Sequence, residues 1–211
     1  MRDAPRGRPL FGHLSIGHEP SGATLIADED LEGLIPEFIA TRADLNLVEY
    51  ENIAKAIPWA TRQAGLVGPL GVLDYRFLFT LHRKMFGDVW RWAGTVRRRE
   101  SNISVYPSQI PDQLKQALDD AVYWHENETF TLDERAARLH FRLVTVHPFP
   151  NGNGRATRLI SDLYLAAAGS TPFTWGSGRQ EVAGKIREAY IRSLVSARTD
   201  DCASLVAFAR S

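Results

Sequence analysis

The residues best suited to chemistry form one short segment, His147–Arg158, which reads HPFPNGNGRATR. Two prolines in it end a preceding helix, while Gly152 and Gly154 permit a tight turn whose backbone N–H groups point outward together. Where such a turn opens a helix, the N–H groups and the helix dipole both favour an anion. The segment therefore predicts a phosphate-binding turn.

Three side chains of this segment could act on a bound phosphate. Arg155 and Arg158 are three residues apart and so share one face of the following helix, where guanidinium groups can bind phosphate through paired hydrogen bonds. His147 lies at the lip of the turn, and an imidazole with an ordinary pKa of about 6.5 can accept a proton at neutral pH. A base beside a phosphate site predicts phosphoryl or nucleotidyl transfer.

Each of these features has a plainer explanation when taken alone, as a helix cap, an ordinary turn or a solvated arginine pair. Their conjunction within twelve residues favours a functional site. The segment is not a Walker A loop, because it lacks GxxxxGK[ST], and it is not a dinucleotide fingerprint, because no strand precedes it. Zinc is disfavoured, since His140 and His147 are seven residues apart with no thiolate nearby.

The apolar residues around the segment recur at helical spacing and predict a mainly α protein. Pro58 and Gly65 weaken the first helical pattern, and Thr131 or Asp133 could cap the helix before the turn. Residues 97–106 (RRRESNISVY) differ, because short alternation of β-branched and polar residues predicts a small β-hairpin. The expected helices cover about 47–57, 75–85, 111–122, 132–146, 153–168, 180–195 and 201–210.

Composition disfavours several classes of protein. The 211 residues hold 25 basic and 25 acidic side chains, so no general excess of cations exists to coat nucleic acid or anionic lipid. Hydrophobic residues make up 44% of the chain, which is enough for a real core. A single cysteine, with no secretory signal and no apolar run of roughly 20 residues, predicts a cytoplasmic protein that does not enter a membrane.

The chain is expected to form one domain behind a flexible arm. Glycine and proline crowd residues 1–24, which predicts the arm. Residues 25–211 would form the domain, with an acidic segment at 25–45, a core at about 46–170 and C-terminal helices within 180–210. The acidic segment could lie against the more basic remainder of the chain, engage a basic partner or stay solvated.

The string HPFPNGNGR resembles the active-site motif of the Fic/Doc (Fido) family, HPFx[DE]GNGR, which commonly continues to a second arginine three residues later. Residues 81–94 resemble the family's LHxxLFxxxxxWAG stretch. Residues 33–36, 41–46 and 172–176 resemble the Fic subgroup called mobile mystery protein B. The resemblance extends from about residue 18 to the C-terminus.

This resemblance implies a Fic-type helical bundle with a short β-hairpin, the flap, beside the active-site loop. It implies an enzyme that transfers AMP from ATP to a Ser, Thr or Tyr hydroxyl of a target protein. His147 would be the base, and Phe149 a buried anchor of the loop. The phosphates would be held by Gly152, Asn153, Gly154, Arg155 and Arg158, and the target by flap residues Arg99, Asn102, Ile103 and Ser104.

Two departures from the family pattern stand out. Asn151 occupies the position of the usual acidic Mg²⁺ ligand, and an uncharged amide predicts weaker metal binding. The inhibitory pattern [ST]xxxE[GN] of many relatives is also absent. Regulation could be lost, could come from a degenerate helix around Glu49 and Glu51, or could come from a separate inhibitor such as the helix-turn-helix protein described beside this subgroup.

Two other functions stay open at the level of sequence. One is a Doc-like phosphotransferase that uses ATP in the reverse orientation. The other is a non-catalytic Fic-fold module that binds nucleotide or protein in a toxin–antitoxin-like pair. Asn151 favours the non-catalytic module, whereas retention of the remaining motif residues favours an enzyme.

Overall fold

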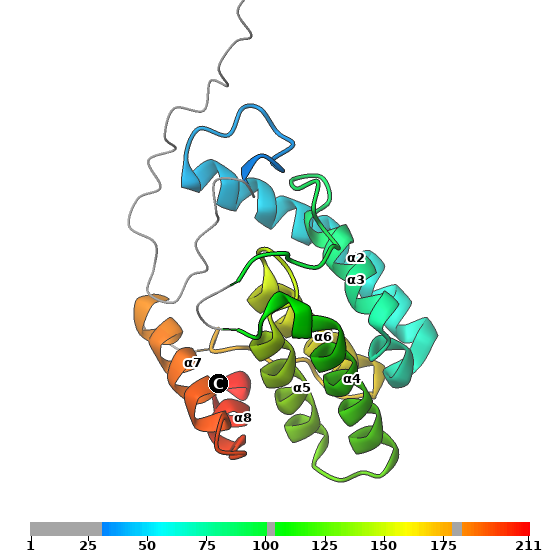
Figure 1. Ribbon diagram of the computed structural model, residues 1–211. Coiled ribbons are helices and arrows are strands. Elements are labelled where there is room, and N and C mark those ends of the chain that lie inside the picture. The colour runs from blue at the N-terminus through cyan, green and yellow to red at the C-terminus, as the bar shows by residue number, and fades with distance from the viewer. Residues whose placement is uncertain (1–30, 101–103, 179–182) are drawn as a thin grey trace, which may run out of the picture.

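A computed structural model describes residues 31–100, 104–178 and 183–211, and the regular secondary structure of these residues is helical (Figure 1). In the described part there is no sheet, only one isolated antiparallel bridge between Leu34 and Trp90. No described helix is both long enough and apolar enough to span a bilayer. The elements are α2 (Arg42–Val72), α3 (Tyr75–Phe86), η1 (Pro107–Gln109), α4 (Ile110–Glu126), α5 (Leu132–Val146), α6 (Asn153–Ala167), α7 (Ala183–Ala197) and α8 (Ala203–Arg210).

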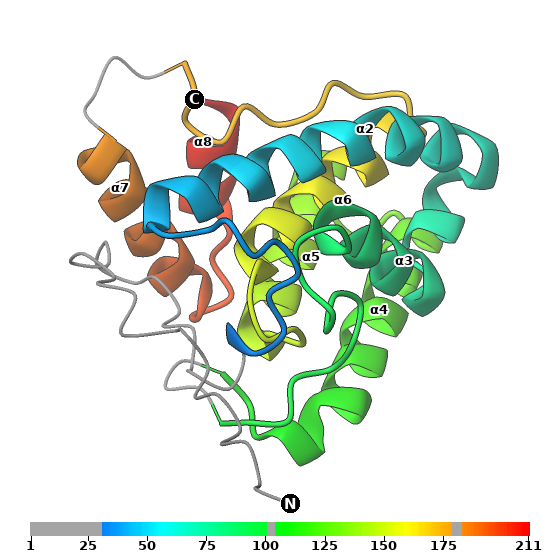
Figure 2. The ribbon, with the colours of Figure 1, turned by 90° about the horizontal axis from the view of Figure 1, so that it is seen from above.

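Helices α5 and α6 form the centre of the bundle. They pack against each other, α2 and α3 contact α6, and α4 and α8 contact α5. Figure 2 shows α2 lying across α6, while α7 and α8 pair on one side of the bundle. Leu139, Leu143 and Ile160 are fully buried between these layers. The loop between the two central helices is therefore surrounded by packed elements, which can hold it in one shape.

Local sequence explains most helix ends. Thr131 caps α5 by accepting the backbone N–H of Glu134 at 3.2 Å, so Thr131 rather than Asp133 is the cap. Asp74 caps α3 in the same way, accepting from the N–H of Arg76 at 2.7 Å. The predicted positions of α3, α4, α5 and α6 are confirmed to within a few residues.

Helix α2 is longer than predicted, because the expected end near Pro58 and Gly65 is wrong. It continues through both residues to Val72 and leaves helical geometry only at Gly68, where φ is +69°, before Pro69 resumes it. Small residues at helical spacing (Ala56, Ala60, Ala64) are buried along the helix, which also packs on α3 and α6. Tertiary packing thus overrides the weak local preference against a helix at these positions.

The predicted hairpin at 97–106 is not formed by the part of it that the structure describes. Residues 97–100 and 104–106 contain no strand. The Arg97 side chain joins these two arms instead, donating to the Arg99 carbonyl oxygen at 2.6 Å and to Ser104 Oγ at 2.7 Å. Predictions for the arm at 1–24, for the acidic residues before Leu31 and for Asn102 and Ile103 lie outside the described residues.

Candidate active site

The loop between α5 and α6 is shaped by two residues with left-handed backbone. His147 ends α5 with φ +53°, and Gly152 precedes α6 with φ +77°. A positive φ is uncommon for a residue with a side chain and is concentrated at functional sites. Phe149 anchors the loop as predicted, since it is fully buried and its ring lies 3.7 Å from the His82 ring.

Asn153 closes the loop with its side chain. Its amide accepts the Phe149 N–H at 2.9 Å and donates to the Phe149 carbonyl oxygen at 2.7 Å. The side chain is buried and engaged on both sides. Asn153 can therefore serve a phosphate through the backbone N–H groups that its side chain holds in place, rather than through the side chain.

The His147 ring has the protonation state that a general base requires. Nδ1 lies 3.3 Å from the Val144 carbonyl oxygen, so it must carry the hydrogen, and Nε2 is the proton acceptor. Burial lowers the pKa of His147 to about 4, the Val144 hydrogen bond opposes this shift, and the nearby Arg97 charge has a smaller lowering effect. The free imidazole is therefore neutral at pH 7.

His82 is a site residue that sequence reasoning did not assign. The Gly94 N–H donates to Nδ1 at 2.9 Å, so Nε2 carries the hydrogen and donates to the Asn151 carbonyl oxygen at 3.0 Å. Burial lowers the pKa of His82 to about 3. This neutral ring ties α3 and the turn after it to the loop. The sequence signals were its place within an apolar helix face and its match to the histidine of the LHxxLF stretch.

Arg155 is held by a residue from a distant helix. Its Nη1 donates to Glu49 Oε2 at 2.7 Å, and the Trp90 indole N–H donates to Glu49 Oε1 at 2.7 Å. The Arg155 guanidinium also lies 4.8 Å from the centre of the Phe86 ring. Glu49 is 2% exposed, whereas the Arg155 side chain keeps 33% of its surface in contact with solvent. Glu49 thus orients the Arg155 guanidinium, which remains accessible to a ligand.

Arg158 turns towards a different part of the bundle. Its Nε donates to the Gly154 carbonyl oxygen at 3.1 Å, and its guanidinium lies 5.6 Å from the centre of the Tyr190 ring on α7. The Tyr190 hydroxyl in turn meets His140 Nε2 at 2.8 Å. The two arginines therefore start from one helix face, as predicted, but α2 orients one and α7 the other. Glu49 contacts Arg155, not Arg158.

The side-chain atoms near Asn151 that could bind a metal do not fit a magnesium site formed by the protein alone. Asn151 Oδ1 accepts the Gly152 N–H at 2.7 Å, and Nδ2 is buried without a hydrogen-bond partner in the described part of the chain. Among the described residues no group of three or more His, Cys, Asp or Glu side chains could hold a metal. The predicted role of Asn151 as a weak ligand gains no support from this geometry.

The described flap residues lie near the loop but do not form a general basic surface. The Arg99 carbonyl oxygen and the Ser104 hydroxyl both accept hydrogen bonds from the Arg97 guanidinium, which also donates to the His147 carbonyl oxygen at 2.6 Å.

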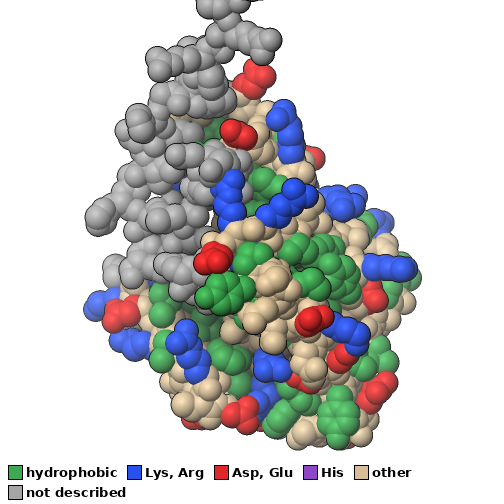
Figure 3. All heavy atoms as spheres, in the orientation of Figure 1, with side chains coloured by type: hydrophobic (Ala, Val, Ile, Leu, Met, Phe, Trp, Pro, Cys, Tyr) green, Lys and Arg blue, Asp and Glu red, His purple; other side chains and the backbone are tan. Residues whose placement is uncertain are grey.

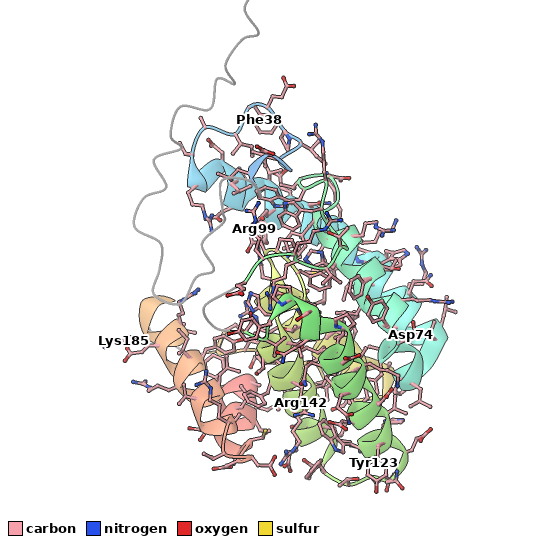
Figure 4. The ribbon with its side chains drawn as sticks, in the orientation of Figure 1. Phe38, Asp74, Arg99, Tyr123, Arg142 and Lys185 are labelled. Carbon is pink, nitrogen blue, oxygen red and sulfur yellow. The ribbon has the colours of Figure 1, made fainter. Side chains whose placement is uncertain are left out.

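In Figure 4, Tyr123 lies at the opposite end of the bundle from Arg99. On the face shown in Figure 3, acidic and basic side chains are interspersed, in keeping with the net charge of zero.

The two glycines of the turn are expected to respond differently to alanine. A Cβ on Gly152 would lie 2.5 Å from the Phe86 ring at a φ of +77°, whereas a Cβ on Gly154 meets nothing within 4 Å. Gly152→Ala should lower the free energy of unfolding by about 1–3 kcal/mol, and Gly154→Ala should leave it nearly unchanged. Gly154→Ala should nevertheless weaken the binding of a phosphate-containing ligand at this turn, because the added methyl group occupies the open space. Urea denaturation and calorimetric titration test both, and equal losses of stability would contradict the geometry.

Acid should destabilise the fold through its buried histidines. Burial lowers the pKa of His82 and His140 to about 3 and that of His147 to about 4, against about 6.5 in the unfolded chain. Below about pH 6.5 the unfolded state therefore binds more protons than the folded state does. The stabilising contribution of each neutral histidine is complete above the pKa of the unfolded chain and is lost as the pH falls towards the pKa of the folded protein. Between about pH 7.5 and about pH 5 we expect a loss on the order of 2 kcal/mol per histidine. A melting temperature that stays constant over this range would contradict this expectation.

Comparisons with known proteins identify relatives of the part of the chain that contains this loop. The family model for the Fic/DOC family matches residues 72–165. The protein adenylyltransferase fic-1 of Caenorhabditis elegans is 35% identical over 99 residues, which cover 45% of this chain and 20% of that protein. The protein adenylyltransferase Fic of Nematostella vectensis is 31% identical over 99 residues, covering 45% and 23%. The chain thus spans about a fifth of the length of these curated relatives.

Solved structures show the same fold. The C. elegans Fic-1 structure superposes with a TM-score of 0.60 at 25% identity, covering 86% of this chain and 52% of that one. The N-terminal Fic domain of a cell filamentation protein from Bartonella quintana gives 0.64 at 20% identity, covering 82% and 84%. The family match over residues 72–165, together with the helical architecture of the chain, shows a Fic/DOC domain that contains the motif loop at 147–158.

Proposed function

We propose that this protein is a protein adenylyltransferase, which transfers AMP from ATP to a Ser, Thr or Tyr hydroxyl of a target protein. The observation that carries the proposal is the neutral His147 at the start of the short loop that leads into α6, whose first turn contains Arg155. The curated relatives named as protein adenylyltransferases support the same chemistry. We also propose that the protein is cytoplasmic and belongs to the subgroup called mobile mystery protein B.

The reaction would be a displacement at the α-phosphorus of ATP. His147 Nε2 takes the proton of the target hydroxyl, and the hydroxyl oxygen forms a bond to the α-phosphorus. The bond from that phosphorus to the oxygen bridging the α- and β-phosphates breaks, and pyrophosphate leaves with the electron pair. Positioning and charge neutralisation supply most of the rate in such transfers, because little covalent work falls to the protein.

The phosphates would be bound at the start of α6. Backbone N–H groups of the turn at Gly152–Gly154 and the helix dipole would bind the α- and β-phosphates. Arg155 and Arg158 would neutralise the β- and γ-phosphates, which carry the charge of the leaving group. A bound triphosphate would also raise the pKa of His147, because nearby negative charge stabilises the imidazolium that forms during the reaction.

The remaining partners follow from the same proposal. The target segment would lie along the flap, where Arg99 and Ser104 belong to the described residues and Asn102 and Ile103 do not. Direct nucleic-acid binding is not expected, given the balanced charge. A separate inhibitory or helix-turn-helix partner would supply the regulation that the missing inhibitory pattern leaves open.

Labelled ATP distinguishes this function from its two rivals. The protein and its His147→Ala variant are incubated with a cell lysate and with ATP labelled at the α- or the γ-phosphate. Transfer of the α-label alone, lost in the variant, is the expected result. Transfer of the γ-label alone would identify a Doc-like phosphotransferase. No transfer of either label would favour the non-catalytic module.

A further inference from the structure

We infer that Arg97 is a positioning residue that joins the flap to the catalytic base. Its guanidinium contacts three separate parts of the chain, namely the end of α5, the residues after Arg97 and the residues before η1. The inference rests on the proposed function for the role of His147. Arg97 would connect the loop at His147 to both described arms of the flap, a connection that the motif residues do not make.

The contacts of Arg97 are directed at carbonyl oxygens of the site. Nε donates to the His147 carbonyl oxygen at 2.6 Å, and the Arg97 backbone N–H donates to that of Pro148 at 2.9 Å. Nη1 donates to the carbonyl oxygen of Arg99 at 2.6 Å. Nη2 donates to Ser104 Oγ at 2.7 Å, to the Val105 carbonyl oxygen at 2.5 Å and to the Val146 carbonyl oxygen at 3.4 Å.

Because the Arg97 guanidinium is buried, its hydrogen-bond donors need acceptors within the protein. Arg97 is 5% exposed, whereas its neighbours Arg98 and Arg99 are exposed. A buried cation is costly unless its donors are satisfied, and the oxygens that accept from the Arg97 guanidinium are all uncharged. Two of them, from Val146 and His147, belong to the C-terminus of α5, where the last carbonyls lack helical partners and favour a cation. The guanidinium therefore remains in place only while His147 and both flap arms keep their positions.

This geometry explains how His147 stays in a left-handed conformation. Its own carbonyl is held by Nε of Arg97, and the next carbonyl is held by the Arg97 backbone. The planar fork of arginine reaches several acceptors at once, whereas the ammonium of lysine is a single point of charge. Arg97 also lies close enough to lower the pKa of His147, although burial of the ring is the larger cause of the shift.

Kinetics of Arg97→Lys test the positioning role. Misplacement of a catalytic group by about 1 Å can cost about 100-fold in rate, so we expect kcat to fall by about that factor while the ATP dissociation constant changes less than about twofold. Arg138→Met is the matched control, because Arg138 is also largely buried at 11% exposure but pairs with Glu134 and Asp200 away from the loop. It should lose stability without losing rate. Equal rates for Arg97→Lys and wild type would overturn the inference.

A second measurement does not depend on activity. NMR titration of the histidine rings, assigned with His147→Ala, follows His147 in wild type and in Arg97→Met. We expect the His147 pKa to rise in Arg97→Met, because a nearby positive charge is removed, while His82 and His140 keep theirs. An unchanged His147 titration would overturn the inference even if transfer is observed. A shifted titration with no transfer would retain the Arg97 contacts and reject the proposed function instead.

Discussion

Replacement of His147 by alanine is expected to lower the rate of AMP transfer by about 10²–10⁴-fold, the usual contribution of a general base. The ring provides the proton acceptor, Nε2, because Nδ1 is engaged with Val144. ATP binding should persist, since the turn at Gly152–Gly154 and the two arginines do not depend on the imidazole. Rate and ATP affinity are measured separately, by transfer of label and by calorimetric titration.

His147→Asn provides a second variant that favours retention of the fold. Position 147 has φ +53°, and asparagine tolerates this region better than alanine does. His125→Ala is a matched control, because that ring lies at the end of α4 and contacts Tyr164 rather than the loop. Residual transfer in both His147 variants at more than about a tenth of the wild-type rate would contradict the role of His147 as general base.

Replacement of Glu49 by alanine is expected to lower the free energy of unfolding by about 3 kcal/mol, the lower end of the range for breaking a buried ion pair. The carboxylate is 2% exposed and accepts from both Arg155 and the Trp90 indole. The lower end applies because Arg155 keeps a third of its surface in water and can regain hydration. Glu51→Ala, on the same helix but exposed, should change stability by less than about 0.5 kcal/mol.

Glu49→Gln separates orientation from charge. Arg155 and Trp90 donate to different oxygens of Glu49, and glutamine keeps only one of the two, so one donor loses its acceptor at about 1–3 kcal/mol. Because Glu49 orients Arg155, we also expect weaker binding of ATP in this variant. Faster transfer or tighter ATP binding would contradict this expectation. It would instead identify Glu49 as the inhibitory residue considered from the sequence.

The helices around the site could be predicted because their signals are local. Thr131 caps α5, Gly152 precedes α6, and the apolar spacing between them marks the buried faces. The extension of α2 past Pro58 could not be predicted, because it depends on packing against α3 and α6. The absence of strand in the described part of the flap also depends on a tertiary contact, since the Arg97 side chain takes the place of backbone pairing between its arms.

The candidate site was predicted only as far as its own segment. The motif contains His147, Arg155 and Arg158 within twelve residues, so their proximity follows from the chain itself. Their partners lie far away in sequence: Glu49 is 106 residues from Arg155, and Arg97 is 50 residues from His147. No periodicity or composition encodes such pairs, because they arise when separate helices pack.

The most direct test of the central claim is the identity of the co-product. The protein is incubated with ATP and a lysate fraction in which labelling occurs, and pyrophosphate and ADP are each measured against the amount of modified protein. The proposed displacement at the α-phosphorus predicts one pyrophosphate for each modified hydroxyl and no corresponding ADP. Stoichiometric ADP without pyrophosphate would show attack at the γ-phosphorus and contradict the assignment of this protein as an adenylyltransferase.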